Sequence, residues 1–229
     1  EEIRNLVGQG AGAMLGRSIW GQAKKEFGKV QDEKIKKEMI KDFTDFYGKN
    51  IVNESTLING VKEFLIWCKE KKISMAVCTN KQERLAVDLL KKLDMYKYFE
   101  YVAGCDTFSF NKPDPRHLTD VVEIVGGDLK KTIMVGDSEV DEMAAANAEL
   151  PFILVKDGYT GKTPKEIKHE YLIEDYVNFE KIINHYLRVF GPCYTLCGRS
   201  WPGDTEEART SRGRALPACV LRCKRPVDI

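Results

Sequence analysis

The chain has 229 residues, of which 43% are apolar and 31% are charged, and its formal net charge is +1. This near-neutral balance gives no electrostatic reason to expect binding to nucleic acid or to an anionic membrane surface. No apolar run approaches the roughly 20 residues that a membrane-spanning helix needs. We therefore expect a soluble cytoplasmic protein, and the few scattered cysteines of its first 190 residues (Cys68, Cys78 and Cys105) also favour a reducing compartment.

The composition changes near residue 190. Residues 1–190 contain 24 Lys and 5 Arg, whereas residues 191–229 contain 1 Lys and 6 Arg. We expect residues 191–229 to be a disordered tail of different origin that lies outside the fold. Four cysteines of this tail could form a zinc site, although their spacing is wider than usual: Cys193, Cys197, Cys219 and Cys223. Because the first residue is Glu1, we also expect a fragment, a processed product or a mis-joined reading frame.

Helical periodicity predicts two helices near the start, over residues 12–27 and 32–47, and we expect them to form part of a small helical domain over residues 1–56. From residue 57 to residue 190 the pattern alternates between short apolar runs and helical spacing. The predicted strands are 73–78, 101–104, 132–135, 152–155 and 171–173; the predicted helices are 59–71, 85–93, 118–125, 140–148 and 176–186. This alternation predicts an α/β fold with a doubly wound parallel sheet.

Polar residues follow the strand at 73–78, where Thr79 and Asn80 precede a predicted helix. Ligands of open parallel sheets bind beyond the carboxyl ends of the strands. A hydroxyl and an amide at such an end leave backbone N–H groups available for an anion. The alternative is an ordinary helix N-cap.

A lysine lies in the stretch NKPDP, residues 111–115. Because Lys112 precedes Pro113, its backbone is biased towards an extended conformation, and the two prolines stiffen the loop. A lysine held in this way can bind phosphate as a point charge. The alternative is a solvated surface lysine.

The stretch IMVGDSEVD, residues 133–141, places Asp137 and Asp141 at the end of another apolar run. Carboxylates at a strand end suit Mg²⁺, which takes oxygen ligands and keeps some of its waters. Ser138 and Asp141 also match a capping box, so that Asp141 could simply begin the next helix. Both interpretations are compatible, because Asp141 can cap the helix while Asp137 binds the metal.

At these positions the chain resembles a known family. Residues 79–80, 112–113 and 136–141 resemble the second, third and fourth motifs of the haloacid dehalogenase superfamily. The two helices before them, which open with LVGQGAGAML at residues 6–15, resemble the helical cap of its phosphoglycolate phosphatase branch. The resemblance extends over about residues 1–190, and the tail has no counterpart in it.

The resemblance implies a phosphatase in which an aspartate attacks phosphorus and water hydrolyses the resulting aspartyl-phosphate. It assigns phosphoryl binding to Thr79, with Asn80 helping to orient the group, and charge stabilisation to Lys112. It assigns Mg²⁺ binding to Asp137, with Asp141 supporting or sharing that role. The implied cofactor is Mg²⁺, and the implied partner is a small phosphorylated metabolite.

The chain departs from the family at the first motif, an Asp-x-Asp at the end of the first and central strand. No Asp-x-Asp occurs in residues 1–229, so the sequence holds no candidate nucleophile and the central strand is missing. A buried strand of three or four large apolar side chains contributes roughly 5–10 kcal/mol, which is comparable with the stability of a whole domain. We therefore expect the chain alone to be poorly stable and to show no phosphatase turnover.

The small, uncharged segment at residues 8–13 is compatible with a small substrate such as 2-phosphoglycolate; the alternative is that its small residues simply allow helices to approach each other. Related sugar-phosphate mutases carry an arginine near the position of Ala11, and its absence argues against a mutase. We expect 2-phosphoglycolate as the substrate, with pyrophosphate or other small monoesters as alternatives. Two further hypotheses are a non-catalytic protein that keeps an anion or Mg²⁺ site, and an interaction or zinc module in the tail.

Overall fold

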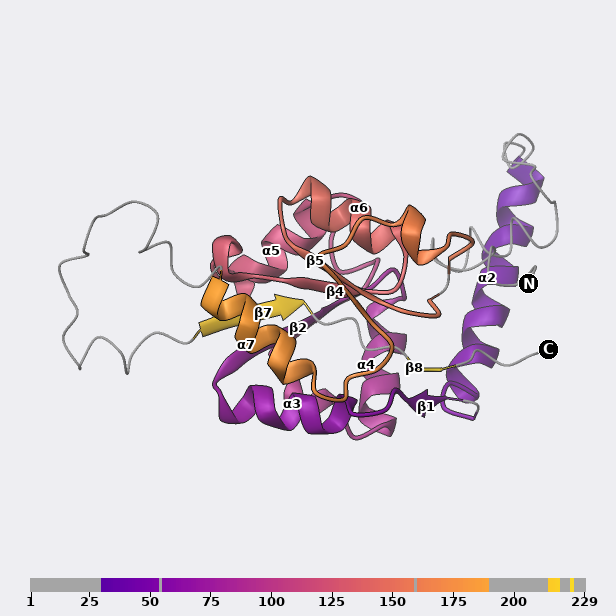
Figure 1. The fold of residues 1–229 in the computed structure, drawn as a ribbon. Helices are drawn as coiled ribbons and strands as arrows, with labels where there is room; N and C mark the ends of the chain where they lie inside the picture. The colour runs from indigo at the N-terminus through magenta and orange to yellow at the C-terminus, as the bar shows by residue number, and fades with distance from the viewer. Residues whose placement is uncertain (1–29, 54, 159, 190–213, 219–222, 225–229) are drawn as a thin grey trace.

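The computed structural model describes residues 30–53, 55–158, 160–189, 214–218 and 223–224. Figure 1 shows helix α2 (Val30–Lys49) at one side of an α/β core. This helix agrees with the one predicted over residues 32–47, whereas the helix at 12–27 and the segment at 6–15 lie outside the described residues. None of the described helices is long and apolar enough to cross a membrane.

The core has the predicted succession of helices and strands, which together form an α/β fold with parallel strands. The strands are β1 (Thr56–Leu57), β2 (Ile73–Cys78), β3 (Tyr101–Ala103), β4 (Met134–Gly136), β5 (Phe152–Val155) and β6 (Tyr171–Ile173). The helices are α3 (Val61–Glu70), α4 (Glu83–Lys92), α5 (Arg116–Ile124), α6 (Glu139–Asn147) and α7 (Phe179–Val189).

The strands form two parallel three-stranded sheets, in the orders β3-β2-β7 and β4-β5-β6. Strand β7 (Arg214–Ala218) pairs in parallel with β2 and lies near β4 (Figure 1). Because β2 and β4 both run towards the loops that carry the predicted site residues, this arrangement brings those loops to one edge.

Strand β7 corrects the expectation that the tail lies outside the fold. Its register places Ser74 opposite Ala215 and Ala76 opposite Ala218, with an irregularity between these pairs. Pro217 lies in that irregular stretch, where a residue without a backbone N–H is tolerated. A second tail strand, β8 (Cys223–Lys224), pairs antiparallel with β1. The tail therefore supplies a strand next to β2, where the sequence predicts a missing one. Of the four cysteines that could form a zinc site, Cys193, Cys197 and Cys219 lie outside the described residues.

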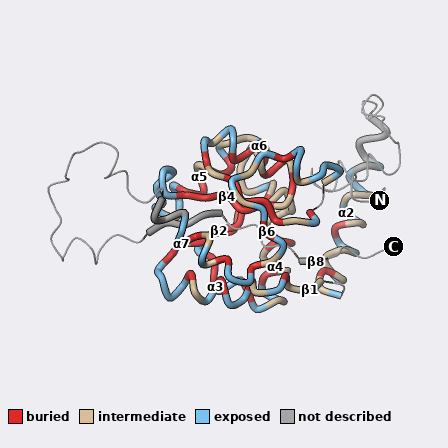
Figure 2. The backbone as a smooth tube through the Cα atoms, viewed as in Figure 1, coloured by how far each residue is buried: buried red, intermediate tan, exposed pale blue. Residues whose placement is uncertain are grey.

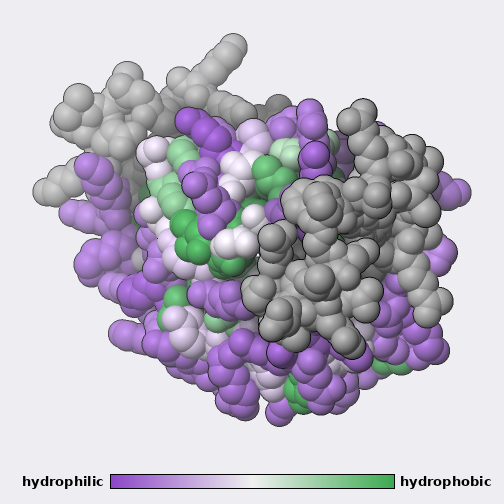
Figure 3. All heavy atoms as spheres, turned by 90° about the vertical axis from the view of Figure 1, so that its left-hand side faces the viewer, coloured by the Kyte–Doolittle hydropathy of each residue, from purple (hydrophilic) through white to green (hydrophobic). Residues whose placement is uncertain are grey.

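Helices cover both faces of the strands, as a doubly wound sheet requires. Helices α3, α4 and α7 lie on one face and α5 and α6 on the other (Figure 1). Each face has its own apolar core, the first around Leu65, Met75 and Ile183 and the second around Leu118, Met134 and Ala144. Figure 2 shows the buried positions concentrated along the strands, and the face drawn in Figure 3 is mostly hydrophilic with smaller hydrophobic groups.

Candidate active site

The loops that follow β2, β3 and β4 meet through side-chain hydrogen bonds. The amide of Asn80, after β2, donates to the carbonyl oxygen of Lys112 at 3.0 Å. The ammonium of Lys112, between β3 and α5, donates to Oδ1 of Asp141 at 2.5 Å. Oδ2 of Asp141 accepts a hydrogen bond from the backbone N–H of Asp137 at 3.1 Å, at the end of β4. The structure thus brings together Asn80, Lys112, Asp137 and Asp141, although they are far apart in the sequence.

The ion pair between Lys112 and Asp141 lies inside the protein. Each side chain exposes only 4% of its surface. The interpretation of Lys112 as a solvated surface lysine is therefore wrong. A buried charge without a partner is costly, so the two residues depend on each other for their place in the fold.

Both carboxylate oxygens of Asp141 accept hydrogen bonds. Oδ2 accepts from the backbone N–H of Ser138 at 3.2 Å and from its hydroxyl at 2.7 Å, in addition to the bond from Asp137. Burial raises the pKa of the Asp141 carboxyl, but the Lys112 ammonium and these hydrogen bonds together hold that pKa below its usual value. The capping box between Ser138 and Asp141 is confirmed, and the metal-binding role of Asp141 stays a prediction.

Two glycines allow the backbone to fit closely around the carboxylates. A Cβ on Gly136 would lie 2.4 Å from Cβ of Asp141, so this glycine makes room for the buried carboxylate. A Cβ on Gly158 would lie 1.7 Å from the carbonyl oxygen of Asp137, so the loop after β5 passes directly against the end of β4. The sequence signal for the second contact is the glycine three residues after an apolar strand.

Thr79 lies at the end of β2 and is not the N-cap of a helix. Helix α4 begins at Glu83, and its N-cap position is Gln82, so the N-cap alternative for residues 79–80 is wrong. The backbone N–H of Thr79 donates a hydrogen bond to the carbonyl oxygen of Ala103 at 2.9 Å. Its hydroxyl oxygen accepts from the backbone N–H of Lys81 at 3.1 Å, which directs the hydroxyl proton elsewhere. The hydroxyl can therefore donate to an anion at this sheet edge.

Asp137 is the partly exposed carboxylate of the site, whereas Asp141 is 3% exposed. The described residues contain no group of three or more His, Cys, Asp or Glu side chains that could hold a metal. Mg²⁺ does not need such a cage, because it is commonly bound by one or two carboxylates, substrate phosphate oxygens and waters. The partly exposed carboxylate of Asp137 at the end of β4 fits that mode of binding, in which Asp137 would be the protein ligand.

Two buried groups, Cys78 and His117, lie next to the site and were not predicted there from the sequence. The Cys78 thiol donates to the carbonyl oxygen of His117 at 3.6 Å, and burial raises the pKa of this thiol to about 12. The His117 side chain is fully buried, and its ring meets Phe108 edge-on at 5.8 Å. Burial, followed by the charge of Lys112, lowers the pKa of His117 to about 4. His117 is therefore neutral near pH 7, and Cys78 is protonated.

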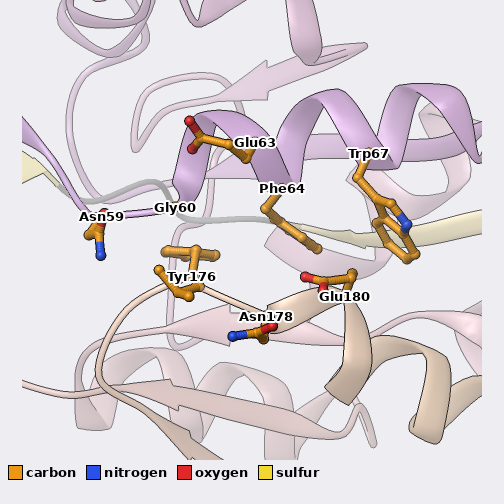
Figure 4. Close-up of a pocket in the computed structure, with 9 residues that line it drawn as sticks. Asn59, Gly60, Glu63, Phe64, Trp67, Tyr176, Asn178 and Glu180 are labelled. Carbon is orange, nitrogen blue, oxygen red and sulfur yellow. The ribbon is translucent and has the colours of Figure 1, made fainter.

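A separate hollow of about 430 Å³ lies between α3 and the start of α7. Figure 4 shows Phe64 and Trp67 of α3 on one side of it and Tyr176 and Glu180 on the other. None of the five predicted site residues lines this hollow. The candidate site is therefore defined by the hydrogen-bonded loops and not by this hollow.

Comparison with known proteins decides the family. The model of the "Haloacid dehalogenase-like hydrolase" family matches residues 13–155, which include all five predicted site residues. The chain belongs to the haloacid dehalogenase-like hydrolase family. The matched region covers the loops after β2, β3 and β4 that are described above.

Relatives within this family are phosphatases by name. A phosphoglycolate phosphatase from Agrobacterium fabrum is 36% identical over 189 residues, which are 80% of this chain and 79% of the relative. One from Mesorhizobium japonicum is 34% identical over 76% of this chain and 74% of the relative. The crystal structure of a predicted phosphoglycolate phosphatase from Haemophilus somnus has a TM-score of 0.70 and 27% identity, covering 79% of this chain and 80% of that chain.

Replacement of Asp141 by Asn leaves Lys112 buried without its countercharge. We expect Asp141→Asn to lower the free energy of unfolding by about 3–5 kcal/mol, measured by urea denaturation at pH 7. Glu142→Gln is the matched control, because it removes a carboxylate from the same turn of α6, and it should cost less than about 1 kcal/mol. A loss of equal size in the two variants would contradict the buried pair.

The buried His117 gives stability a pH dependence. The unfolded imidazole binds a proton near pH 6.5, whereas the folded one stays neutral down to about pH 4. The contribution of His117 to the free energy of unfolding is therefore fully present above pH 6.5. It decreases as the pH falls, by about 2 kcal/mol between pH 7 and pH 5. Between pH 7 and pH 5, the free energy of unfolding of the His117→Phe variant should decrease by about 2 kcal/mol less than that of the wild-type protein, measured by chemical denaturation. The same pH dependence in both proteins would contradict a neutral buried His117.

Proposed function

We propose that this chain carries the substrate-binding part of a phosphatase for small phosphate monoesters, and that 2-phosphoglycolate is its substrate. The single observation that carries the proposal is the connection of the strand-end loops through Asn80, Lys112 and Asp141. Its support includes relatives at 36% and 34% identity that are named phosphoglycolate phosphatase. Pyrophosphate and other small monoesters remain the alternative substrates.

In this proposal the side chains of the site divide the work of holding a phosphoryl group. The Thr79 hydroxyl donates to a phosphoryl oxygen, because its own oxygen already accepts from Lys81. The Lys112 ammonium uses one of its three N–H groups on Asp141 and can direct others to the phosphate. The side-chain amide of Asn80 donates to the backbone carbonyl oxygen of Lys112 and so fixes the loop that carries this lysine. These groups concentrate donors and positive charge where negative charge develops during phosphoryl transfer.

Asp137 would hold Mg²⁺ together with phosphate oxygens and waters. When bound, the cation supplies positive charge that stabilises the phosphoryl oxygens. Asp141 contributes indirectly: it orients Lys112 and accepts a hydrogen bond from the N–H of Asp137, which fixes the end of β4. We therefore assign metal binding first to Asp137 and a positioning role to Asp141.

A second candidate function follows from the missing first motif. Residues 1–229 contain no Asp-x-Asp, so the covalent step has no candidate nucleophile within them. A protein that keeps Thr79, Lys112 and Asp137 without a nucleophile would bind phosphate and Mg²⁺ and would not turn over. Thermal stabilisation by both ligands without phosphate release would identify this function.

A restored nucleophile should separate the two functions. We expect an amino-terminal extension with an apolar strand ending in Asp-x-Asp to give Mg²⁺-dependent phosphate release from 2-phosphoglycolate, measured with a phosphate assay. The same extension with Asn in place of the first Asp is the control, and it should be slower by at least about 10³-fold. Residues 1–229 should give no release above the uncatalysed rate. Mg²⁺-dependent release by the unextended chain, abolished by Asp137→Asn, would contradict the expected inactivity.

A further inference from the structure

The backbone of Lys81 is fixed beside the phosphate-binding end of β2. Its N–H donates to the Thr79 hydroxyl oxygen at 3.1 Å, and its carbonyl oxygen accepts from Cys105 at 2.9 Å. A Cβ on Gly104 would lie 2.7 Å from that carbonyl oxygen, so the loop after β3 fits tightly against Lys81. The side chain of Lys81 therefore extends from a fixed backbone position, two residues after Thr79.

The side chain of Lys81 reaches helix α2, in the segment predicted as the cap. Its ammonium donates to the Tyr47 hydroxyl at 2.6 Å and lies 4.2 Å from the centre of the Tyr47 ring. Both residues are half-buried. The ammonium thus lies at the boundary between α2 and the core, on the side where Thr79 ends β2.

Lys81 differs from the other positively charged side chains near the site because its side-chain partner is neutral. Lys112 is paired with Asp141, and Arg116 is paired with Asp114. Within the part of the chain that the structure describes, Lys81 forms no ion pair, and its recorded side-chain partner is the neutral Tyr47. Tyr47 accepts a hydrogen bond from Lys81, so its own hydroxyl proton is directed elsewhere. The pair therefore presents N–H and O–H donors and one uncompensated positive charge.

We propose that Lys81, held in place by Tyr47, binds the carboxylate of the substrate while the strand-end loops bind its phosphate. The proposal rests on the proposed function and adds the basis of its specificity. 2-Phosphoglycolate carries a carboxylate in addition to its phosphate, and charge-assisted hydrogen bonds to a carboxylate are among the stronger polar contacts. Inorganic phosphate has no such group. Lys81 is then the specificity-determining residue, and Tyr47 is its positioning residue.

The test is a comparison of two ligands, because a merely structural contact would affect both equally. Binding of 2-phosphoglycolate and of inorganic phosphate to the full chain is measured by calorimetry with Mg²⁺ present. We expect Lys81→Met, which removes the charge and keeps the stem, to weaken 2-phosphoglycolate binding at least about tenfold. Phosphate binding should change less than about twofold, and Lys81→Arg should recover most of the lost affinity.

Two further variants complete the comparison. Lys92→Met is the matched control, because Lys92 also contacts α2, through the carbonyl oxygen of Gly48 at 3.4 Å, but lies at the far end of α4. It should change neither affinity. Tyr47→Phe removes the hydroxyl and keeps the ring, and it should weaken only 2-phosphoglycolate binding. Circular dichroism verifies folding, and Lys81→Gln replaces Lys81→Met if the latter does not fold.

The outcomes separate this inference from the proposed function. Equal effects of Lys81→Met on both ligands, or no effect on either, would overturn the carboxylate site and leave the phosphate site intact. A wild-type chain that binds 2-phosphoglycolate no more tightly than phosphate would also overturn it. A wild-type chain that binds neither ligand would refute the proposed function, and this inference with it.

Discussion

The buried pair of Lys112 and Asp141 is the interaction on which the rest of the site depends. Each residue comes from a different loop, and neither charge can remain inside the protein without the other. Their contact therefore fixes the loop after β3 against the start of α6. Asn80 extends the connection to the loop after β2 through the Lys112 carbonyl oxygen. One ion pair thus determines how three strand ends meet.

The same pair separates the roles of the two carboxylates. Asp141 is enclosed by Lys112, by Ser138 and by the N–H of Asp137, and Gly136 provides the space for it. Asp137 remains partly exposed at the end of β4, where a cation with its waters can reach it. Two aspartates four residues apart therefore have different environments: Asp141 is buried and connects the loops, whereas Asp137 is partly exposed.

The sequence predicted much of the fold because buried parallel strands are short, continuous apolar runs. The runs at 73–78, 152–155 and 171–173 became β2, β5 and β6 with the predicted bounds. Strand β7 was missed because Arg214–Ala218 contains an arginine and a proline and has no clear alternation. Its pairing with β2 joins segments more than 130 residues apart, and no local pattern indicates such a contact.

The sequence could indicate the motif residues, which stay predicted site residues, but it could not indicate their contacts with one another. Nothing in the spacing of Lys112 and Asp141 shows that they pair, or that their pairing buries both. The contact of Lys81 with Tyr47 joins a loop to a helix 34 residues earlier. Tyr47 is the last residue of the helix predicted over 32–47, and His117 precedes the helix predicted over 118–125, so nothing in the sequence singled out either residue. These relations depend on tertiary packing, which periodicity does not record.

The titration of Asp141 tests the central claim most directly, namely that a buried and ionised Asp141 holds Lys112 in the site. The carboxyl carbon of Asp141 can be followed by carbon NMR as the pH is lowered. The account predicts that Asp141 titrates below its usual pKa of about 3.9, and that Lys112→Met raises this pKa because the burial penalty is then uncompensated. A pKa at or above the usual value in the wild-type protein, unchanged by Lys112→Met, would contradict it.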